Sequence, residues 1–161
     1  MDTVLTISGE VERPQSLSLA DLRALAGDEV VADFHCREGW SRLDERWSGV
    51  RLARLLAFAA ARSSGRYVTV ASGEYAAVLS RAQAEDERVL LAVAQPGRSD
   101  GFPRLVGPSE WDCFQSVKSV DRIELTSEPG AATAETIALA RIEPNAQATP
   151  RLGSRTGKKE E

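Results

Sequence analysis

The residues best suited to chemistry lie between Asp33 and Ser41, a stretch that contains the only His of the chain and one of its two Cys residues. Cys36 follows a β-branched, apolar run and precedes charged residues, a Gly and a Trp. A thiol at the end of a strand can act as a thiolate ligand for a metal or as a nucleophile. Cys36 is therefore the first candidate functional residue, and a buried structural Cys is the alternative that composition alone favours.

Composition narrows the classes of protein to consider. The 161 residues are 42% hydrophobic, which suits one globular domain with a real core. A net charge of −4 gives no electrostatic case for a nucleic-acid partner. The longest apolar run is too short to cross a membrane, and the first residues lack a secretory signal pattern. Cys36 and Cys113 form no CxxC motif, so we expect a cytoplasmic protein without a disulfide framework or a zinc site.

The elements around Cys36 can be predicted from residue patterns. The run Glu29 to Phe34 favours a strand that delivers His35 and Cys36 at its end. The stretch 39–49 contains Trp, Gly and several charges, and we interpret it as an ordered loop. The stretch 50–62 has Leu residues at helical spacing and predicts an amphipathic helix.

The rest of the chain predicts short strands and a few helical turns. Ser18 and Asp21 form a capping box that would begin a helix over 19–25. Further strands are expected over 3–11, 67–71, 75–79, 89–93, 104–106 and 116–126, and helical turns over 80–86. This order favours an α+β fold that is mixed and largely β, with a few short helices. We expect one domain over 1–126, followed over 127–161 by a mostly disordered tail in which 134–142 could form a short helix.

Five segments, in this order, resemble the sulfite-oxidase-type molybdopterin-binding domain. They are Phe34–Ser41 with Trp47–Val50, then Ser72–Tyr75, Leu90–Ala92, Gly101–Val106 and Ser116–Leu125. The resemblance implies a mixed, largely β fold around molybdopterin, a pyranopterin dithiolene that chelates molybdenum. It also implies oxygen-atom transfer on a small oxyanion or an S-oxide, in which the cofactor carries the chemistry and the protein orients it.

The same resemblance gives roles to two residues near the proposed metal, Cys36 and Tyr75, and strand geometry gives an expectation for a third, His35. The Cys at the position of Cys36 is the protein's ligand to molybdenum in the family, and a soft thiolate suits that metal. Tyr75 matches a Tyr close to the metal, whose phenol could hydrogen-bond an oxo ligand or a substrate oxygen; packing in a hairpin is its alternative role. His35 would point to the opposite strand face from Cys36, so we expect a hydrogen bond to the cofactor or a structural role rather than co-ligation.

Cofactor-phosphate binding is implied for Arg104, Ser116 and Lys118, which match the family's cationic and hydroxyl donors. Without the resemblance, Arg104 and Lys118 would be interpreted as ordinary surface residues. The chain departs from the family at Ser119, where a Trp is usual, and in the loop around Cys113.

The sequence leaves three hypotheses for the function of this chain. The first is a molybdenum-cofactor-dependent oxidoreductase with a small-molecule substrate and an electron-transfer partner protein. The second is a non-catalytic binding or interaction module that keeps the fold and binds the cofactor weakly or not at all, which the altered loop around Cys113 motivates. The third is a thiol-based redox protein that uses Cys36.

Overall fold

The computed structural model describes residues 5–35, 41–108 and 116–130, with the backbone alone at 32–35 and 41–44. These residues form nine strands and three short helices. The strands are β1 (Leu5–Gly9), β2 (Gln15–Leu17), β3 (Asp28–His35), β4 (Ser41–Arg51), β5 (Tyr67–Ser72), β6 (Tyr75–Ser80), β7 (Leu90–Ala94), β8 (Arg104–Val106) and β9 (Arg122–Thr126). The helices are α1 (Leu19–Leu25), α2 (Leu52–Phe58) and α3 (Arg81–Ala84).

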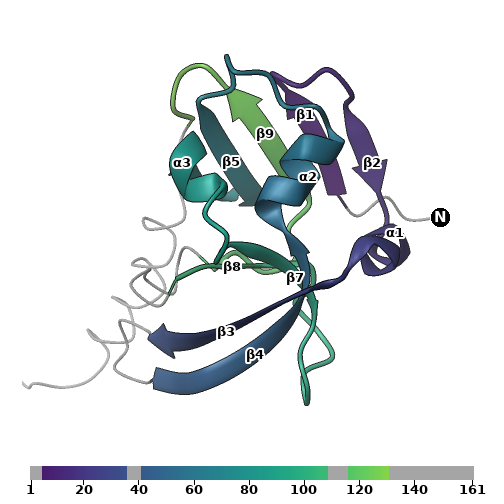
Figure 1. Cartoon of the computed structure of the whole chain (residues 1–161), viewed down its shortest axis with the longest axis vertical. Helices are drawn as coiled ribbons and strands as arrows, with labels where there is room; N and C mark the ends of the chain where they lie inside the picture. Colours follow the sequence, from purple (N-terminus) through teal and green to yellow (C-terminus); the bar gives the residue numbers. More distant parts are fainter. Residues whose placement is uncertain (1–4, 36–40, 109–115, 131–161) are drawn as a thin grey trace, which may run out of the picture.

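The strands form two sheets, which are separate layers in Figure 1. One has five strands in the order β2-β1-β9-β5-β6, and the other has four in the order β3-β4-β7-β8. Only β1 and β9 run parallel; every other described pair is antiparallel. The long β3–β4 hairpin extends away from the five-stranded sheet (Figure 1). The predicted mixed, largely β fold with few short helices is confirmed.

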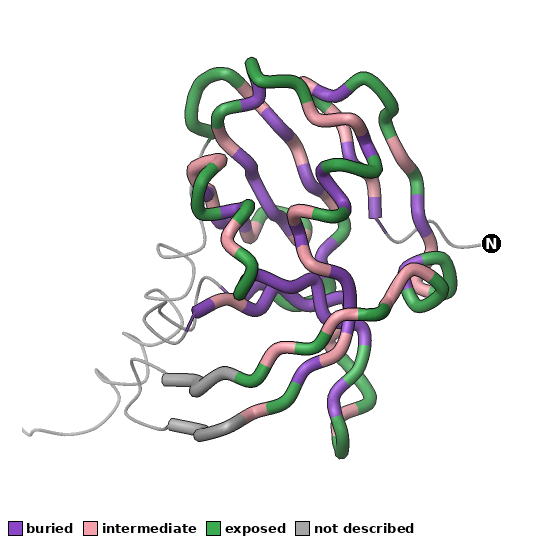
Figure 2. Tube along the Cα trace, in the orientation of Figure 1, coloured by how far each residue is buried: buried purple, intermediate pink, exposed green. Residues whose placement is uncertain are grey.

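The core is one large apolar cluster that joins the five-stranded sheet to α2 and to strands of the second sheet. Helix α2 contributes Leu52, Leu55 and Leu56, all with at most 1% of their surface exposed. Full burial of each such side chain contributes about 1.5 to 3 kcal/mol. Figure 2 shows the buried residues along the strands of both sheets, which explains how the core holds the two sheets together.

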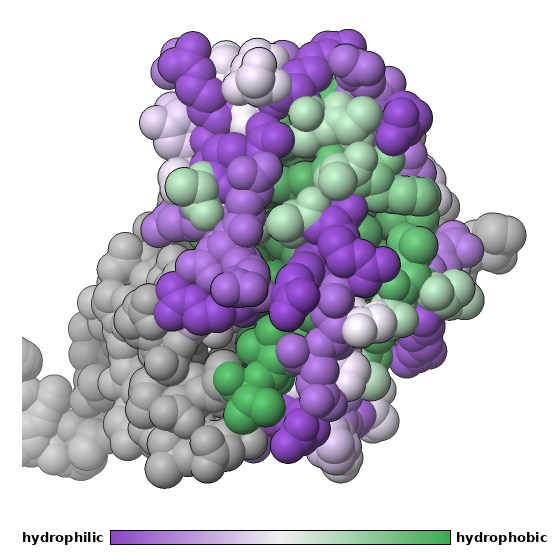
Figure 3. All heavy atoms as spheres, in the orientation of Figure 1, coloured by the Kyte–Doolittle hydropathy of each residue, from purple (hydrophilic) through white to green (hydrophobic). Residues whose placement is uncertain are grey.

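Polar side chains cover much of the face in Figure 3, and apolar side chains show between them. Among the described residues, Val31 and Phe58 are the large apolar side chains that are exposed. They lie on different elements, so they give no sign of a docking surface. None of the helices in the described ranges is long and apolar enough to cross a membrane.

The ordered loop predicted over 39–49 was wrong, because most of that stretch belongs to β4 (Ser41–Arg51). Its charged residues gave no strand pattern, but β4 pairs with β3 on one side and β7 on the other. Pairing with neighbours decides strand formation more than residue type does. The same pairing shortens the helix predicted over 50–62 to α2 (Leu52–Phe58), since Val50 and Arg51 still belong to the sheet.

Helix α1 begins as the sequence predicts. Ser18 Oγ accepts a hydrogen bond from the Asp21 N–H at 3.0 Å, and the Asp21 carboxylate accepts one from the Ser18 N–H at 3.0 Å.

The strand predicted over 116–126 is shorter and covers only β9 (Arg122–Thr126). The sequence did not predict β2. The predicted helix over 134–142, and the predicted tail beyond residue 130, lie outside the described residues.

Candidate functional site

The candidate metal ligand Cys36 lies outside the described residues, but the two ends of its segment are placed. His35 is the last residue of β3 and pairs with Ser41, the first residue of β4. The pairing register of the two strands shifts by one residue between Ala32 and Phe34. The backbone at the end of this hairpin therefore fixes where the segment 36–40 leaves and re-enters the sheet.

Arg104 and Ser116 lie in contact, as a shared phosphate site requires. The Arg104 Nε donates to Ser116 Oγ at 3.0 Å, and Ser116 Oγ donates to the Leu105 carbonyl oxygen at 2.7 Å. The guanidinium of Arg104 also lies over the ring of Trp47, 5.2 Å from its centroid, in a cation–π arrangement. Arg104 is only 5% exposed, so its orientation is set by the protein. A guanidinium held in this way binds an anionic oxygen strongly.

Lys118 is exposed and lies on the segment that follows Ser116. A Cβ atom on Gly101 would lie 3.8 to 3.9 Å from three carbons of the Lys118 side chain, so the stem of this Lys runs along Gly101. Gly101 has a φ of +83°, a conformation that favours glycine. The Ser119 N–H donates to the Gly101 carbonyl at 2.9 Å, and the Val120 N–H donates to that of Pro103 at 2.8 Å.

These hydrogen bonds explain why the strand predicted over 116–126 begins late. Val117 accepts from Leu105 in β8, and Ser119 and Val120 donate to the chain that leads into β8. Backbone bonds to the five-stranded sheet begin only at Asp121. The result is that Lys118 lies next to the segment that carries Arg104. The structure therefore places Arg104 in contact with Ser116 and places the segment that carries Lys118 beside the chain that leads to Arg104.

Tyr75 is the first residue of β6 and pairs with Ser72 across a tight turn. It is partly buried against the large core cluster, which agrees with the packing role considered for it. The Gly73 N–H of this turn donates to Asp121 Oδ2 at 2.9 Å, and the Asp121 N–H donates to the Ala71 carbonyl at 2.9 Å. Asp121 therefore ties the turn before Tyr75 to the segment that carries Lys118. Nothing in the sequence singled out Asp121, an exposed carboxylate in a predicted strand.

Trp47 is 1% exposed and lies in a small cluster with Leu90, Ala92 and Val106. A second guanidinium, that of Arg98, lies 5.7 Å from the same ring centroid. Sequence reasoning missed Arg98, because its loop has only the turn pattern of Pro and Gly.

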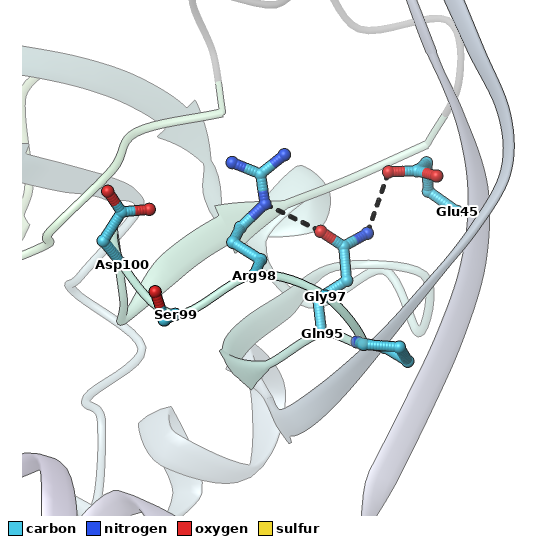
Figure 4. Close-up of a pocket in the computed structure, with 7 residues that line it drawn as sticks. Glu45, Gln95, Gly97, Arg98, Ser99 and Asp100 are labelled. Atoms are coloured by element: carbon cyan, nitrogen blue, oxygen red, sulfur yellow. Dashed lines mark hydrogen bonds between the residues drawn. The ribbon is translucent and has the colours of Figure 1, made fainter.

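Arg98 belongs to a hydrogen-bonded chain of side chains beside Trp47. The Arg98 Nε donates to Gln95 Oε1 at 2.8 Å, and Gln95 Nε2 donates to Glu45 Oε1 at 2.9 Å (Figure 4). These three residues border a polar pocket of about 370 Å³, a volume at the lower end of those that hold small ligands. The pocket is lined by Glu45, Gln95, Pro96, Gly97, Arg98, Ser99 and Asp100.

Two carboxyl groups with shifted pKa values lie outside this region. Burial raises the pKa of Asp28, but hydrogen bonds from the Arg51 N–H and the Arg54 guanidinium outweigh burial and hold that pKa below its usual value. The side-chain hydrogen bond from Arg88 lowers the pKa of Asp86 to about 2. Asp28 bonds to Arg51 and Arg54 at the start of α2, and Asp86 bonds to Arg88 in the loop before β7. These contacts indicate that both carboxylates stabilise the fold. Within the described residues, no group of three or more His, Cys, Asp or Glu residues could hold a metal ion.

The donor set of Arg104, Ser116 and Lys118 fits the anionic end of molybdopterin. The buried guanidinium of Arg104 is held through its Nε by the Ser116 hydroxyl, and its terminal N–H groups offer charge-assisted hydrogen bonds to phosphate oxygens. The exposed ammonium group of Lys118, on the segment before β9, adds a second positive charge. This local positive charge contrasts with the net charge of −4 for the whole chain.

Known oxidoreductases have sequences similar to that of this chain. The chain is 34% identical over 130 residues to the uncharacterized oxidoreductase YuiH of Bacillus subtilis, a match covering 77% of this chain and 65% of that protein. It is 29% identical over 162 residues to the protein-methionine-sulfoxide reductase catalytic subunit MsrP of Campylobacter jejuni, covering 83% of this chain and 52% of MsrP. MsrP of Xanthomonas campestris is 31% identical over 144 residues, covering 76% of this chain and 44% of that protein. The chain therefore spans about half the length of these relatives.

A solved structure with the same fold is that of the sulfane dehydrogenase SoxCD from Paracoccus pantotrophus. It superposes with a TM-score of 0.68 at 23% sequence identity, covering 78% of this chain and 38% of the SoxCD chain. The family model of the oxidoreductase molybdopterin binding domain matches residues 2–134. The match covers most of the chain and includes every described strand, so this chain belongs to the oxidoreductase molybdopterin binding domain family, whose cofactor is molybdopterin.

Proposed function

We propose that the chain catalyses oxygen-atom transfer at the sulfur of a small molecule, with the Cys36 thiolate as the protein's ligand to molybdenum. Membership of the molybdopterin-binding family is the observation that carries this proposal. Reduction of an S-oxide is the favoured direction, because two similar sequences are named as methionine-sulfoxide reductases. An electron-transfer partner protein and a cytoplasmic location are further parts of the proposal.

The remaining candidate residues have roles in holding the cofactor and the substrate. Arg104, Ser116 and Lys118 would hold the phosphate, and His35 would hydrogen-bond the cofactor from the end of β3. When bound, the cofactor supplies the metal centre at which the oxygen atom is transferred. The phenol of Tyr75 would donate a hydrogen bond to the oxygen of the substrate, which stabilises negative charge that develops there.

The ligand role of Cys36 is tested by cofactor content. Wild type, Cys36→Ser and the matched control Cys113→Ser are produced with added molybdate, and molybdenum and pterin are measured per protein. We expect wild type and Cys113→Ser to contain both, and Cys36→Ser to contain much less molybdenum. Equal molybdenum in wild type and Cys36→Ser would contradict the ligand role. Absence of pterin from all three would favour the non-catalytic binding module.

The role of Tyr75 is tested by turnover of a small S-oxide, such as methionine sulfoxide, with a reduced viologen dye as electron donor. Tyr75→Phe keeps the ring packed against the core and removes the hydroxyl, so we expect turnover to fall about 100-fold with unchanged pterin content. Sulfite oxidation is assayed in parallel. Turnover of sulfite but not of the S-oxide would reverse the proposed direction.

A further inference from the structure

Two guanidinium groups share one buried aromatic ring. Arg98 lies 5.7 Å and Arg104 lies 5.2 Å from the centroid of Trp47. The two charges are therefore at most about 11 Å apart, close to the screening length of about 8 to 10 Å at physiological salt. An anion bound at one of them is attracted by both.

Arg98 is held in a fixed direction. Its Nε donates to Gln95 Oε1, and Gln95 is only 9% exposed and is itself bonded to Glu45. A guanidinium that is stacked on a ring and bonded through Nε keeps its two terminal nitrogens for another partner. In Figure 4 these nitrogens point away from Gln95, into the space between Asp100 and Glu45.

No carboxylate in the described part of the chain lies within ion-pair distance of Arg98. The carboxylate of Glu45 accepts from Gln95, and Asp100 is exposed to solvent at the edge of the pocket. Because the exposed Asp100 carboxylate is screened by water, it offsets only part of the attraction that Arg98 exerts on an anion. The half-buried Glu45 carboxylate is hydrogen-bonded to Gln95 and is not ion-paired with Arg98.

The pocket borders the segment that carries the phosphate-binding residues. Asp100 lines the pocket, and the next residue, Gly101, contacts the stem of Lys118. Arg98 and Arg104 share the Trp47 ring, and the stem of Lys118 lies beside the residue that directly follows the pocket.

We propose that Arg98 is a further cofactor-binding residue, which gives the anionic end of molybdopterin a second guanidinium, and that Gln95 is a positioning residue that sets its direction. This inference rests on the proposed function only in requiring that the chain binds molybdopterin. Neither residue matches a segment by which the sequence resembles its family.

The test measures how tightly the purified holoprotein keeps its pterin. Wild type, Arg98→Gln, Arg98→Lys and Gln95→Met are dialysed at increasing salt, and pterin per protein is measured by fluorescence after oxidation. Loss of a charge-assisted hydrogen bond predicts a dissociation constant about 10-fold higher for Arg98→Gln. Arg98→Lys keeps the charge without the planar fork, and Gln95→Met keeps the guanidinium without its anchor, so both should be intermediate.

Arg88→Gln is the matched control, because Arg88 is an exposed Arg paired with Asp86 away from the pocket. It should keep pterin as wild type does. Equal pterin retention by wild type and Arg98→Gln at every salt concentration would overturn the inference and leave the proposed function standing. If wild type contains no pterin, the proposed function fails and the inference fails with it. Thermal melts of all variants check folding, and if Arg98→Gln is unstable, Arg98→Lys and Gln95→Met decide.

Discussion

At the scale of single residues, Gly49 shows how closely β4 and β7 approach each other. A Cβ atom at this position would lie 2.1 Å from the Leu91 carbonyl oxygen and 2.7 Å from the Ala92 Cα. Both atoms belong to the backbone, so neither can turn aside as a side chain can. The register of the two strands shifts next to this point, between Ser48 and Gly49. Glycine is therefore required here by packing.

We expect Gly49→Ala to lower the free energy of unfolding by about 2 to 3 kcal/mol, because the sheet must open to admit the methyl group. Gly27→Ala is the control, since the nearest atom to a Cβ there is 3.9 Å away, on the flexible side chain of Arg54. Urea unfolding of both variants in the same cofactor state measures the difference. Equal stabilities would mean that β4 and β7 separate at little cost.

Asp28 is the second residue whose surroundings give a measurable effect. Its carboxylate accepts the Arg51 N–H at 3.0 Å and the Arg54 Nη1 at 2.7 Å, and joins the start of β3 to the start of α2. Because the folded-state pKa lies below the ordinary 3.8, the stability from this charge is present in full above that value. It is lost as the pH falls through the folded-state pKa.

At pH 7 we therefore expect Asp28→Asn to lower the free energy of unfolding by about 1 to 2 kcal/mol. The difference from wild type should shrink as the pH is lowered below about 4. Glu29→Gln is the control, because its ion pair with Arg46 is half exposed and contributes at most about 1 kcal/mol. Thermal melts from pH 7 to pH 3 provide the measurement, and a difference that stays constant with pH would contradict the charge-based explanation.

At the scale of elements, Asp121 joins three parts of the structure. Its carboxylate accepts from the β5–β6 turn, its N–H donates to the end of β5, and its carbonyl accepts from Thr6 in β1 at 3.1 Å. In Figure 1 the end of β5 points toward β7 and β8. The contact through Asp121 therefore couples the turn that carries Tyr75 to the segment that carries Lys118.

We expect Asp121→Ala to cost about 1 kcal/mol of stability, because the Gly73 N–H loses its acceptor but can bond to water. Asp121→Asn keeps an acceptor oxygen and should be close to wild type. If Asp121 also sets the place of Tyr75, turnover of the S-oxide should fall in Asp121→Ala at saturating substrate. Hydrogen exchange at Gly73, which should be faster in Asp121→Ala alone, distinguishes this effect from general loss of stability.

At the scale of the whole molecule, cofactor binding and folding are linked. A ligand that binds only the folded state raises stability by about 2.7 kcal/mol when its concentration is 100 times its dissociation constant. The phosphate-binding candidates lie on β8 of the four-stranded sheet and on the segment that leads into β9 of the five-stranded sheet. Cofactor bound to both should therefore stabilise the contact between the sheets.

We expect protein from a host that cannot make molybdopterin to melt several degrees below the holoprotein, and addition of the cofactor to restore the difference. Cofactor-free Arg104→Gln serves as the control that should not respond to the addition. Identical melting temperatures for the cofactor-free and holo wild type would mean that the cofactor contributes no net stability, as the non-catalytic module would predict.

The sequence by itself determined the broad fold, because strand patterns, the capping box at Ser18 and the apolar spacing in α2 are local signals that act within a few residues. The ordered motifs also determined the family and its cofactor. The proposed roles of Cys36 and Tyr75 come from that resemblance, and they stay predictions.

The tertiary structure decided what depends on partners far apart in the chain. The stretch around Trp47 is a strand because β3 and β7 pair with it, and the segment before β9 leaves its sheet because it bonds to the chain before β8. The residues next to Arg98 do not predict a binding role for it, since its guanidinium is placed by the ring of Trp47, which lies 51 positions earlier in the chain. Such contacts are set by packing and register, which residue patterns along the chain do not specify.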